Sequence, residues 1–386
     1  MPASAICRSP RFSQAAWIVR AFVVARILLF AFIYLVRDTI PARVNNWNKG
    51  LIAFPNSRFW DSFVGWDSGW YNRVALHGYY FEGSQSDVAF FPAFPYLSRW
   101  VGYLVGGHVI GGLVISNLAL LGGLFFVYGI AGRYGTRRFQ ERAVIYALIY
   151  PTSIFLSAYY TEGLFFFAAA GALYFYETEQ LILAGLFGCL AALTRSTGVM
   201  LFPALAIGLL HRRHYAFFQL GPRFYARACA LLLIPCGLLC VMWMQKVQVG
   251  DPFAFINIQR NWGRSAADPS ALVTTLYNTA HRLWLPNTSS FLAVELGATL
   301  VLFLAAAVSM YRLDFAHTIF ILCVAALPLS TGVIESMSRY ALSAVPIYLI
   351  FAFAGRSRSV DRALTVGFVL LLALHTSLFV SGYWAG

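Results

Sequence analysis

Long apolar segments recur along nearly the whole chain, and they constrain its fold more than any other feature of the sequence. A helix that crosses a bilayer needs about 20 mostly apolar residues. Of the 386 residues 60% are hydrophobic, enough for about eleven such helices, and only 11% are charged. This composition excludes a soluble cytosolic enzyme. We expect an all-α integral membrane protein with about eleven transmembrane helices, within a range of about nine to thirteen.

The apolar runs differ in length, which bears on how deeply their connecting turns lie. The runs occupy residues 15–36, 108–132, 143–158, 163–176, 181–194, 196–210, 228–247, 290–311, 315–334, 340–354 and 362–382. The four between 143 and 210 have about 14–16 residues each, and such a helix covers about 21–24 Å of a core about 30 Å thick. We expect their turns to lie below the membrane surface, unless two pairs form re-entrant hairpins.

The arginines indicate the orientation of the chain. The formal net charge is +13, but the arginines form short clusters between apolar runs and no basic stripe, so we expect no nucleic-acid partner. The clusters fall on one side of the membrane when the N-terminus is cytoplasmic, as the positive-inside rule requires. They comprise Arg8, Arg11, Arg133, Arg137, Arg138, Arg142, Arg212, Arg213, Arg223, Arg227, Arg312, Arg356, Arg358 and Arg362.

Two long polar connections, residues 37–107 and 248–289, both face outward in this topology. The first is rich in aromatic residues, which favours amphipathic helices that lie on the membrane interface. We interpret residues 1–386 as a single multi-spanning membrane module with two extracytoplasmic loops and no separate soluble domain.

Most acidic residues also fall on the outer side, and few lie near a predicted midplane, where a carboxylate usually marks an ion pathway. This distribution favours a reaction site at the outer face. Asp67, in the first loop, precedes Trp70 and Tyr71 at helical spacing, so it can be the N-cap of an interfacial helix. Its place between Trp66 and Trp70, in a partly dry cleft, also suits a general base.

Arg195 and Arg339 depart from this topology because each lies in a short outer turn between apolar runs. An arginine in such a place needs an anionic partner. One interpretation pairs Arg195 with Glu162, and Arg339 with Glu335, as structural ion pairs. In the other, each guanidinium binds a phosphate through two parallel hydrogen bonds. The two interpretations are compatible.

The second outer loop presents Gln259, Arg260, Trp262 and Arg264 on a predicted short surface helix. Most residues of such a helix are simply solvated, but Trp262 can stack on a sugar and Arg260 can contact a phosphate. In the first loop, Asp87 precedes a stiff aromatic-proline segment and can anchor it. The cysteines and histidines lack the spacing of zinc ligands, so we assign no metal ligand.

Several short motifs follow one another in and beside the outer turns. They are Trp66-Asp67, Trp70-Tyr71, Gly78-Tyr79, Ala89-Phe90-Phe91-Pro92, Phe94-Pro95, Tyr150-Pro151-Thr152-Ser153-Ile154-Phe155, Tyr160-Thr161-Glu162 and Thr194-Arg195-Ser196-Thr197-Gly198. In this order and spacing they resemble the PIG-V-like mannosyltransferases over about residues 60–198, and more loosely over 259–264 and 338–346. Thr197 departs from the family pattern, in which asparagine is expected after Arg-Ser.

The resemblance implies a GT-C type glycosyltransferase, a multi-spanning enzyme that uses polyprenyl or dolichyl phosphate mannose at the extracytoplasmic or lumenal face. Eukaryotic members of the family transfer mannose to a glycosylphosphatidylinositol precursor. This chain is shorter and has only two lysines, so we interpret it as a prokaryotic member in the plasma (inner) membrane, or in the endoplasmic reticulum membrane if eukaryotic. The expected partners are the polyprenyl phosphate sugar donor, a lipid-linked or glycan acceptor, and membrane lipids.

The resemblance also suggests roles for the candidate residues. Asp67 is predicted to take the proton from the acceptor hydroxyl in a single inverting displacement. Arg195, Arg339 and Arg260 are predicted to contact the donor phosphate. The residues predicted to position the sugar or the acceptor are Asp87, Glu162, Trp66, Trp70, Gln259 and Trp262. No cofactor is required, although a divalent metal that bridges the phosphate to Asp67 and Asp87 is compatible with the sequence.

Two alternatives stay open. A GT-C relative could use another lipid-linked sugar, such as an arabinose or a glucose. A lipid or sugar transporter, or a flippase, would also need many spans and a site for an anionic lipid. However, the inverted repeats and polar midplane residues that are typical of transporters are not evident in the sequence.

Overall fold

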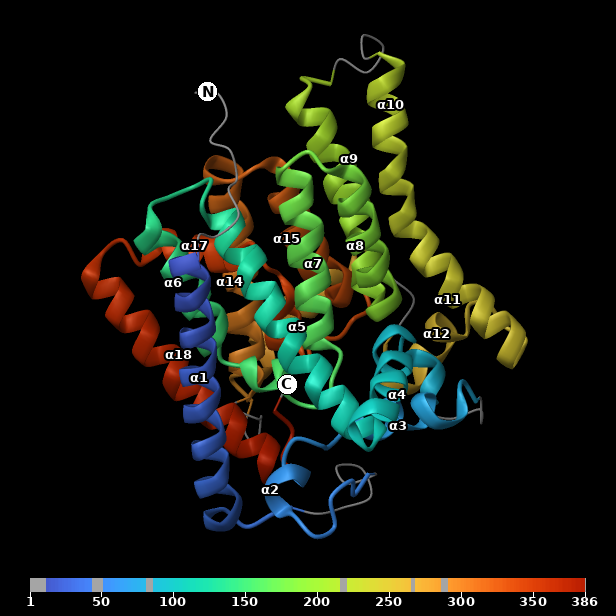
Figure 1. Cartoon of the computed structure of the whole chain (residues 1–386), viewed down its shortest axis with the longest axis vertical. Helices are drawn as coiled ribbons and strands as arrows, with labels where there is room; N and C mark the ends of the chain where they lie inside the picture. Colours follow the sequence, from blue (N-terminus) through green and yellow to red (C-terminus); the bar gives the residue numbers. More distant parts are fainter. Residues whose placement is uncertain are drawn as a thin grey trace.

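The computed structural model of this chain describes residues 12–43, 51–80, 86–215, 221–264, 268–285 and 291–385. Every regular element within those ranges is a helix, as the sequence predicts, and they contain no strand (Figure 1). Arg8 and Arg11, which contributed to the predicted orientation, lie outside the described residues.

Five helical segments among the described residues are long and apolar enough to cross a membrane. They are α1 (Phe12–Thr39), α5 (His108–Ala131), the continuous segment Phe224–Val249, α14 (Phe291–Arg312) and α18 (Arg358–Val380). The segment Phe224–Val249 combines most of α10 (Pro222–Ala228), η5 (Cys229–Leu232) and α11 (Leu233–Val249). These segments agree with the predicted membrane protein, but they are fewer than the eleven expected spans.

The other apolar runs form helices too short to meet the same length criterion. They are α6 (Arg137–Ile149), α7 (Glu162–Glu177), α8 (Leu181–Thr194), α9 (Leu201–Arg212) and α15 (Phe315–Leu329). The 14 residues of α8 cover only about 21 Å along its axis. The short helices predicted between residues 163 and 210 are therefore confirmed.

Two runs that were predicted to be continuous are broken at prolines. In the run 143–158, α6 ends at Ile149, and Tyr150 and Pro151 lead into the short 3-10 helix η2 (Ser153–Leu156). The run 340–354 divides into α16 (Met337–Ser343) and α17 (Ile347–Ala354), which meet at an angle of 87° and form either a broken span, the sixth candidate, or a re-entrant loop. Proline disfavours helical backbone in the preceding residue, so hydropathy alone overestimates the length of both helices.

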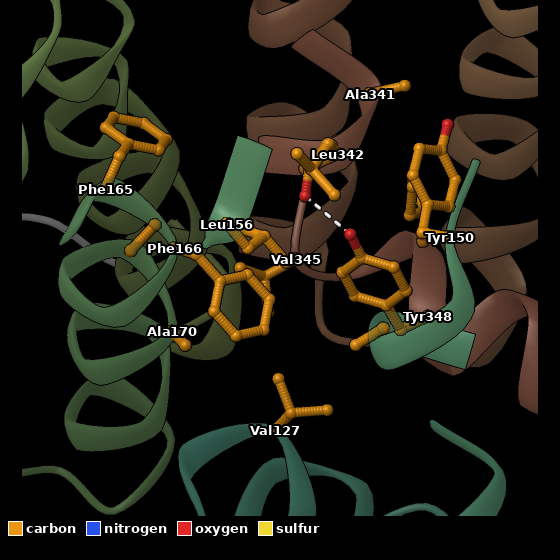
Figure 2. Packing of buried hydrophobic residues seen from close by; sticks show 14 of the residues in the cluster. Val127, Tyr150, Leu156, Phe165, Phe166, Ala170, Ala341, Leu342, Val345 and Tyr348 are labelled. Atoms are coloured by element: carbon orange, nitrogen blue, oxygen red, sulfur yellow. Dashed lines mark hydrogen bonds between the residues drawn. The ribbon is translucent and has the colours of Figure 1, made fainter. Parts of the chain in front are cut away.

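The centre of the bundle is built from close helix contacts. Val127 of α5, Phe166 and Ala170 of α7, and Tyr348 of α17 lie in one buried cluster (Figure 2). The Tyr348 hydroxyl donates to the Leu342 carbonyl at 2.6 Å, which satisfies a polar atom at the break between α16 and α17. Small residues let α5 approach its neighbours closely, as in other membrane bundles: a Cβ added to Gly112 would lie 2.2 Å from the Tyr159 ring.

The first long loop carries short helices at the end of the bundle away from α10 (Figure 1). These are α2 (Arg58–Asp61), α3 (Ser68–His77), η1 (Asp87–Ala89) and α4 (Ala93–Val105). On α4, Trp100, Tyr103 and Leu104 are exposed while Phe94 and Ser98 are buried. This amphipathic pattern fits the interfacial helices predicted for the loop.

A buried charge cluster lies at the C-terminal end of α7. The Glu177 carboxylate lies 2.9 Å from Arg133 Nε, 3.1 Å from Arg212 Nη2 and 2.8 Å from His317 Nε2. A negative charge at the C-terminus of a helix is unfavourable, and these partners compensate it. The cluster therefore connects the end of α5, α7, α9 and α15.

Candidate active site

Asp67 lies at a strained turn directly before α3. Trp66 has a left-handed backbone with φ of 51°, a conformation that costs a residue with a side chain about 1–2 kcal/mol. Asp67 occupies the N-cap position, but its carboxylate makes no capping hydrogen bond to α3. The predicted N-cap position of Asp67 is therefore confirmed, but its carboxylate does not cap the helix and is available for other contacts.

Tyr159 and Tyr160 hold this turn in place. The Tyr160 hydroxyl donates to the Gly65 carbonyl at 2.9 Å and accepts from the Asp67 N–H at 3.2 Å. The Ser68 hydroxyl donates to the Tyr159 carbonyl at 3.2 Å. Burial, together with the Asp67 carboxylate, raises the pKa of Tyr160 well above its usual range, so the phenol keeps its proton.

Arg339, on α16, joins Asp67 to a second carboxylate. Its Nη1 lies 3.0 Å from Asp67 Oδ2, while its Nε and Nη2 lie 3.0 and 2.6 Å from Glu162 Oε1. The guanidinium also lies over the rings of Phe155 and Tyr160, with its carbon 4.7 and 5.0 Å from their centroids. All of its nitrogens are thus engaged by the protein.

Glu162, the first residue of α7, is completely buried between two arginines. Arg195, from the turn after α8, places Nη1 at 2.6 Å from Glu162 Oε1 and 3.3 Å from Thr161 Oγ1. The predicted pair of Arg195 with Glu162 is confirmed. The predicted pair of Arg339 with Glu335 is wrong, because Arg339 binds Glu162 and Asp67 instead.

The short helix α16 is held by a carboxylate that the sequence did not indicate. Glu295 of α14 accepts hydrogen bonds from the Ser338 N–H at 2.8 Å and from the Ser338 hydroxyl at 3.0 Å. Because Arg339 follows Ser338 directly, Glu295 fixes the backbone from which the guanidinium extends.

A cavity of about 590 Å³ opens beside Asp67. Its lining comprises Trp66, Asp67, Trp70, Tyr71, Ala89, Phe90, Phe91, Thr194, Arg195, Ser196, Gln259, Trp262, Gly263, Arg264, Val333, Glu335, Ser336, Arg339, Tyr340 and Trp384. The structure thus brings together seven of the predicted site residues: Asp67, Trp66, Trp70, Arg195, Arg339, Gln259 and Trp262.

One wall of the cavity is aromatic. The Trp70 and Phe90 rings stack at 5.9 Å, and Trp262 meets both edge-on at 6.3 and 6.1 Å. Residues of the first and second long loops therefore meet at this wall. Tyr71 lies behind it, where its hydroxyl is 3.2 Å from Thr161 Oγ1. Burial and the Glu162 carboxylate raise the pKa of Tyr71 above its usual value, so it also stays neutral.

Three predicted site residues are not among the described residues that line the cavity. Glu162 lies behind Arg195 and Arg339. Arg260 is exposed, and its Nε donates to the Asn257 carbonyl at 3.0 Å. Asp87 is buried and accepts from the Tyr80 N–H at 2.9 Å, so it anchors its own loop. Asp87 does not line the cavity beside Asp67, and the metal bridge considered between the two carboxylates stays a prediction.

The cavity also contains residues that the sequence did not single out as site residues. They are Arg264, Glu335, Ser336, Tyr340 and Trp384. One local signal precedes Arg264: Gly263 ends the 3-10 helix η6 (Ile258–Trp262) with a left-handed φ of 72°. A glycine at this point redirects the chain, so the next side chain need not follow the surface of η6.

This chain matches a known protein family and a known relative. The family model described as Mannosyltransferase (PIG-V) matches residues 16–260. GPI mannosyltransferase 2 of Yarrowia lipolytica (strain CLIB 122 / E 150) is 26% identical over 182 residues, which span 46% of this chain and 48% of that protein. The match therefore extends over about half the length of this relative.

Two solved structures are also similar to this chain. ArnT from Cupriavidus metallidurans, bound to undecaprenyl phosphate, has 11% identity and a TM-score of 0.53, covering 95% of this chain and 76% of ArnT. The second is the archaeal oligosaccharyltransferase AglB from Archaeoglobus fulgidus, in complex with an inhibitory peptide and a dolichol-phosphate. It has 15% identity and a TM-score of 0.44, and the match covers 97% of this chain and 57% of AglB. The likeness to ArnT supports the predicted GT-C fold.

Proposed function

We propose that this chain, which belongs to the PIG-V mannosyltransferase family, transfers mannose from a polyprenyl phosphate donor to a hydroxyl group of a lipid-linked or glycan acceptor. The observation that carries the proposal is the placement of Asp67 at a cavity lined by arginines and aromatic rings. A transfer of this kind needs a base for the acceptor, positive charge for the phosphate and a surface for the sugar.

Asp67 serves as the base in this reaction. Its Oδ2 accepts from Arg339, whereas Oδ1 accepts no hydrogen bond from the residues that the structure describes, and the side chain is 26% exposed. Oδ1 takes the proton of the acceptor hydroxyl as that oxygen bonds to the anomeric carbon. The bond between this carbon and the phosphate oxygen breaks, the phosphate leaves with the electron pair, and the sugar configuration inverts.

Two features support a lipid phosphate sugar as donor. ArnT, whose fold is similar, binds undecaprenyl phosphate. In this chain, Trp70, Phe90 and Trp262 form an aromatic wall on which a sugar ring can stack, close to the arginines of the cavity. In this proposal Gln259 and Trp66 contribute to positioning the substrates, while Glu162 and Asp87 support the cavity from behind.

The proposed orientation follows from the charges on the connecting segments. With the arginine clusters in the cytoplasm, Asp67 faces the extracytoplasmic side, in the inner membrane of a prokaryote or the endoplasmic reticulum of a eukaryote. Lipid substrates then reach the cavity from the outer leaflet.

The test is transfer of radiolabelled mannose from polyprenyl phosphate mannose by the purified protein, with a membrane extract as acceptor source. Asp67→Asn should reduce transfer by about 10²–10⁴-fold while insertion and expression persist. Asp38→Asn is the control, because Asp38 is an exposed carboxylate in the last turn of α1 and does not line the cavity. Wild-type activity in Asp67→Asn would refute the role of Asp67. Transfer from a glucose or arabinose donor instead would indicate another sugar, and movement of the lipid without sugar transfer would indicate a transporter.

A further inference from the structure

Three arginines line the cavity, but two of them are already neutralised by the protein. Arg195 binds Glu162, and Arg339 binds both Glu162 and Asp67. Two carboxylates and two guanidinium groups therefore form a cluster without net charge. A substrate phosphate that recruited either arginine would compete with a buried carboxylate for it, which is costly.

Arg264 is the third arginine of the cavity, and its charge is not compensated in this way. Within the described part of the chain, no carboxylate lies within 4.0 Å of its guanidinium. Its one hydrogen bond is weak, from Nη1 to Thr331 Oγ1 at 3.5 Å. The side chain is partly buried at the cavity wall, where solvent screens its charge less than on an open surface.

The backbone explains why Arg264 faces the cavity while Arg260 does not. Arg260 lies within η6 and bonds to the Asn257 carbonyl of the preceding turn. Gly263 then adopts its left-handed conformation and ends the helix, so that Arg264 leaves η6 beside Trp262. The aromatic wall and the uncompensated cation thus come from one short segment of the second loop.

We propose that Arg264 binds the phosphate of the lipid donor, whereas Arg195 and Arg339 mainly hold Glu162 and Asp67 in position. This assignment rests on the proposed function. A donor phosphodiester carries one negative charge, and the phosphate monoester that leaves carries about −1.5 to −2 at neutral pH. Arg264 therefore stabilises the leaving group more strongly than the bound donor, which favours transfer.

The test measures binding of farnesyl phosphate, a short polyprenyl phosphate, and of uncharged farnesol to the purified full-length protein by tryptophan fluorescence. Arg264→Gln should weaken farnesyl phosphate binding about 10- to 100-fold, the usual effect of losing one charged hydrogen bond, and leave farnesol binding unchanged. Arg264→Lys should recover part of the lost affinity, because lysine restores the positive charge but not the planar fork of guanidinium donors. The control Arg260→Gln removes a neighbouring arginine outside the cavity and should bind like the wild type.

The assignment is overturned if Arg264→Gln binds farnesyl phosphate as tightly as the wild-type protein, or if Arg260→Gln weakens binding equally. It is also overturned if the wild type shows no preference for farnesyl phosphate over farnesol. These outcomes are distinct from failure of the proposed function, because Asp67→Asn should lose transfer and still bind farnesyl phosphate. Unchanged melting of Arg264→Gln would show that the loss of binding is not a loss of folding.

Discussion

Arg339 Nη1 lies 3.0 Å from Asp67 Oδ2, although 272 positions separate the two residues in the chain. The same guanidinium binds Glu162, so one side chain fixes both carboxylates of the site. The position of Asp67 therefore depends on α16, which is itself held by Glu295.

Replacing Arg339 should impair both folding and activity. Arg339→Gln leaves the buried Glu162 with one partner fewer and Asp67 with none, a change that costs about 3–5 kcal/mol for buried pairs. Arg339→Lys keeps the positive charge but lacks the planar fork of donors with which the guanidinium spans Asp67 and Glu162, so its effect should be smaller than that of Arg339→Gln. Thermal unfolding in detergent and mannose transfer measure the two effects. Equal stability of all three proteins would contradict this role.

The interaction of Glu162 with Arg195 can be isolated by a double-mutant cycle. Glu162→Gln alone leaves two arginines without their shared carboxylate and should destabilise the protein strongly. Adding Arg195→Gln removes one of these charges, so the double variant should lose less stability than the sum of the single losses. We expect a coupling of about 0.5–3 kcal/mol from melting measurements. Strict additivity would show that the pair is not coupled.

Glu295 should act on the reaction through α16. Glu295→Ala leaves the buried Ser338 N–H without an acceptor, at a cost of about 1–3 kcal/mol, and frees the backbone next to Arg339. Glu295→Gln keeps an acceptor oxygen and should recover most of the activity. Steady-state kinetics should show a loss in kcat with little change in donor KM. A change in KM alone would place Glu295 in substrate binding instead.

Trp262 should contribute to donor binding by ring stacking. Trp262→Ala removes one ring of the aromatic wall, and an aromatic contact worth about 1 kcal/mol corresponds to a rise of about 5-fold in donor KM. Trp100→Ala is the control, because Trp100 lies on the exposed face of α4 and does not line the cavity. An equal effect of the two replacements would argue against stacking at Trp262.

Gly78 should resist substitution for two separate reasons. Its φ of 77° disfavours any side chain, and an added Cβ would lie 2.7 Å from Gln248 Oε1, which accepts from the Tyr79 N–H. Gly250 has a similar φ of 81° with no atom within 4 Å of an added Cβ. Gly250→Ala should therefore cost only the backbone strain of about 1–2 kcal/mol, and Gly78→Ala should cost more. Unfolding of both variants measures the difference.

Hydropathy predicted where the helices lie but not where they break. Each apolar run contains a helix, because apolar composition determines which segments the bilayer can accommodate. The breaks at Pro151 and Pro346 depend on single residues, which an average over a window conceals. One of these breaks is essential to the site, since it leaves α16 as a short separate helix that carries Arg339.

The sequence predicted most residues of the site but not all of the ion pairs between them. Arg195 and Arg339 each lie in a short turn between apolar runs, which indicated that they needed anionic partners, and both are ion-paired. The sequence suggested Glu335 for Arg339 because the two are close in the chain, whereas the fold brings Asp67 to it. The position of Arg264 at the cavity depends on the turn at Gly263. Composition and spacing do not predict the direction of a side chain, so the sequence did not place Arg264 there.

Helix α7 carries a fully compensated carboxylate at each end, Glu162 beside the cavity and Glu177 about 22 Å away along the helix axis. Sliding or rotating α7 would break ion pairs at both ends simultaneously, so this helix behaves as a strut with two anchored ends. Movements that admit and release substrates are then expected outside α7 and outside α16, whose Arg339 is ion-paired to one end of this strut. Asp67, which the same arginine binds, should keep its position as substrates enter and leave.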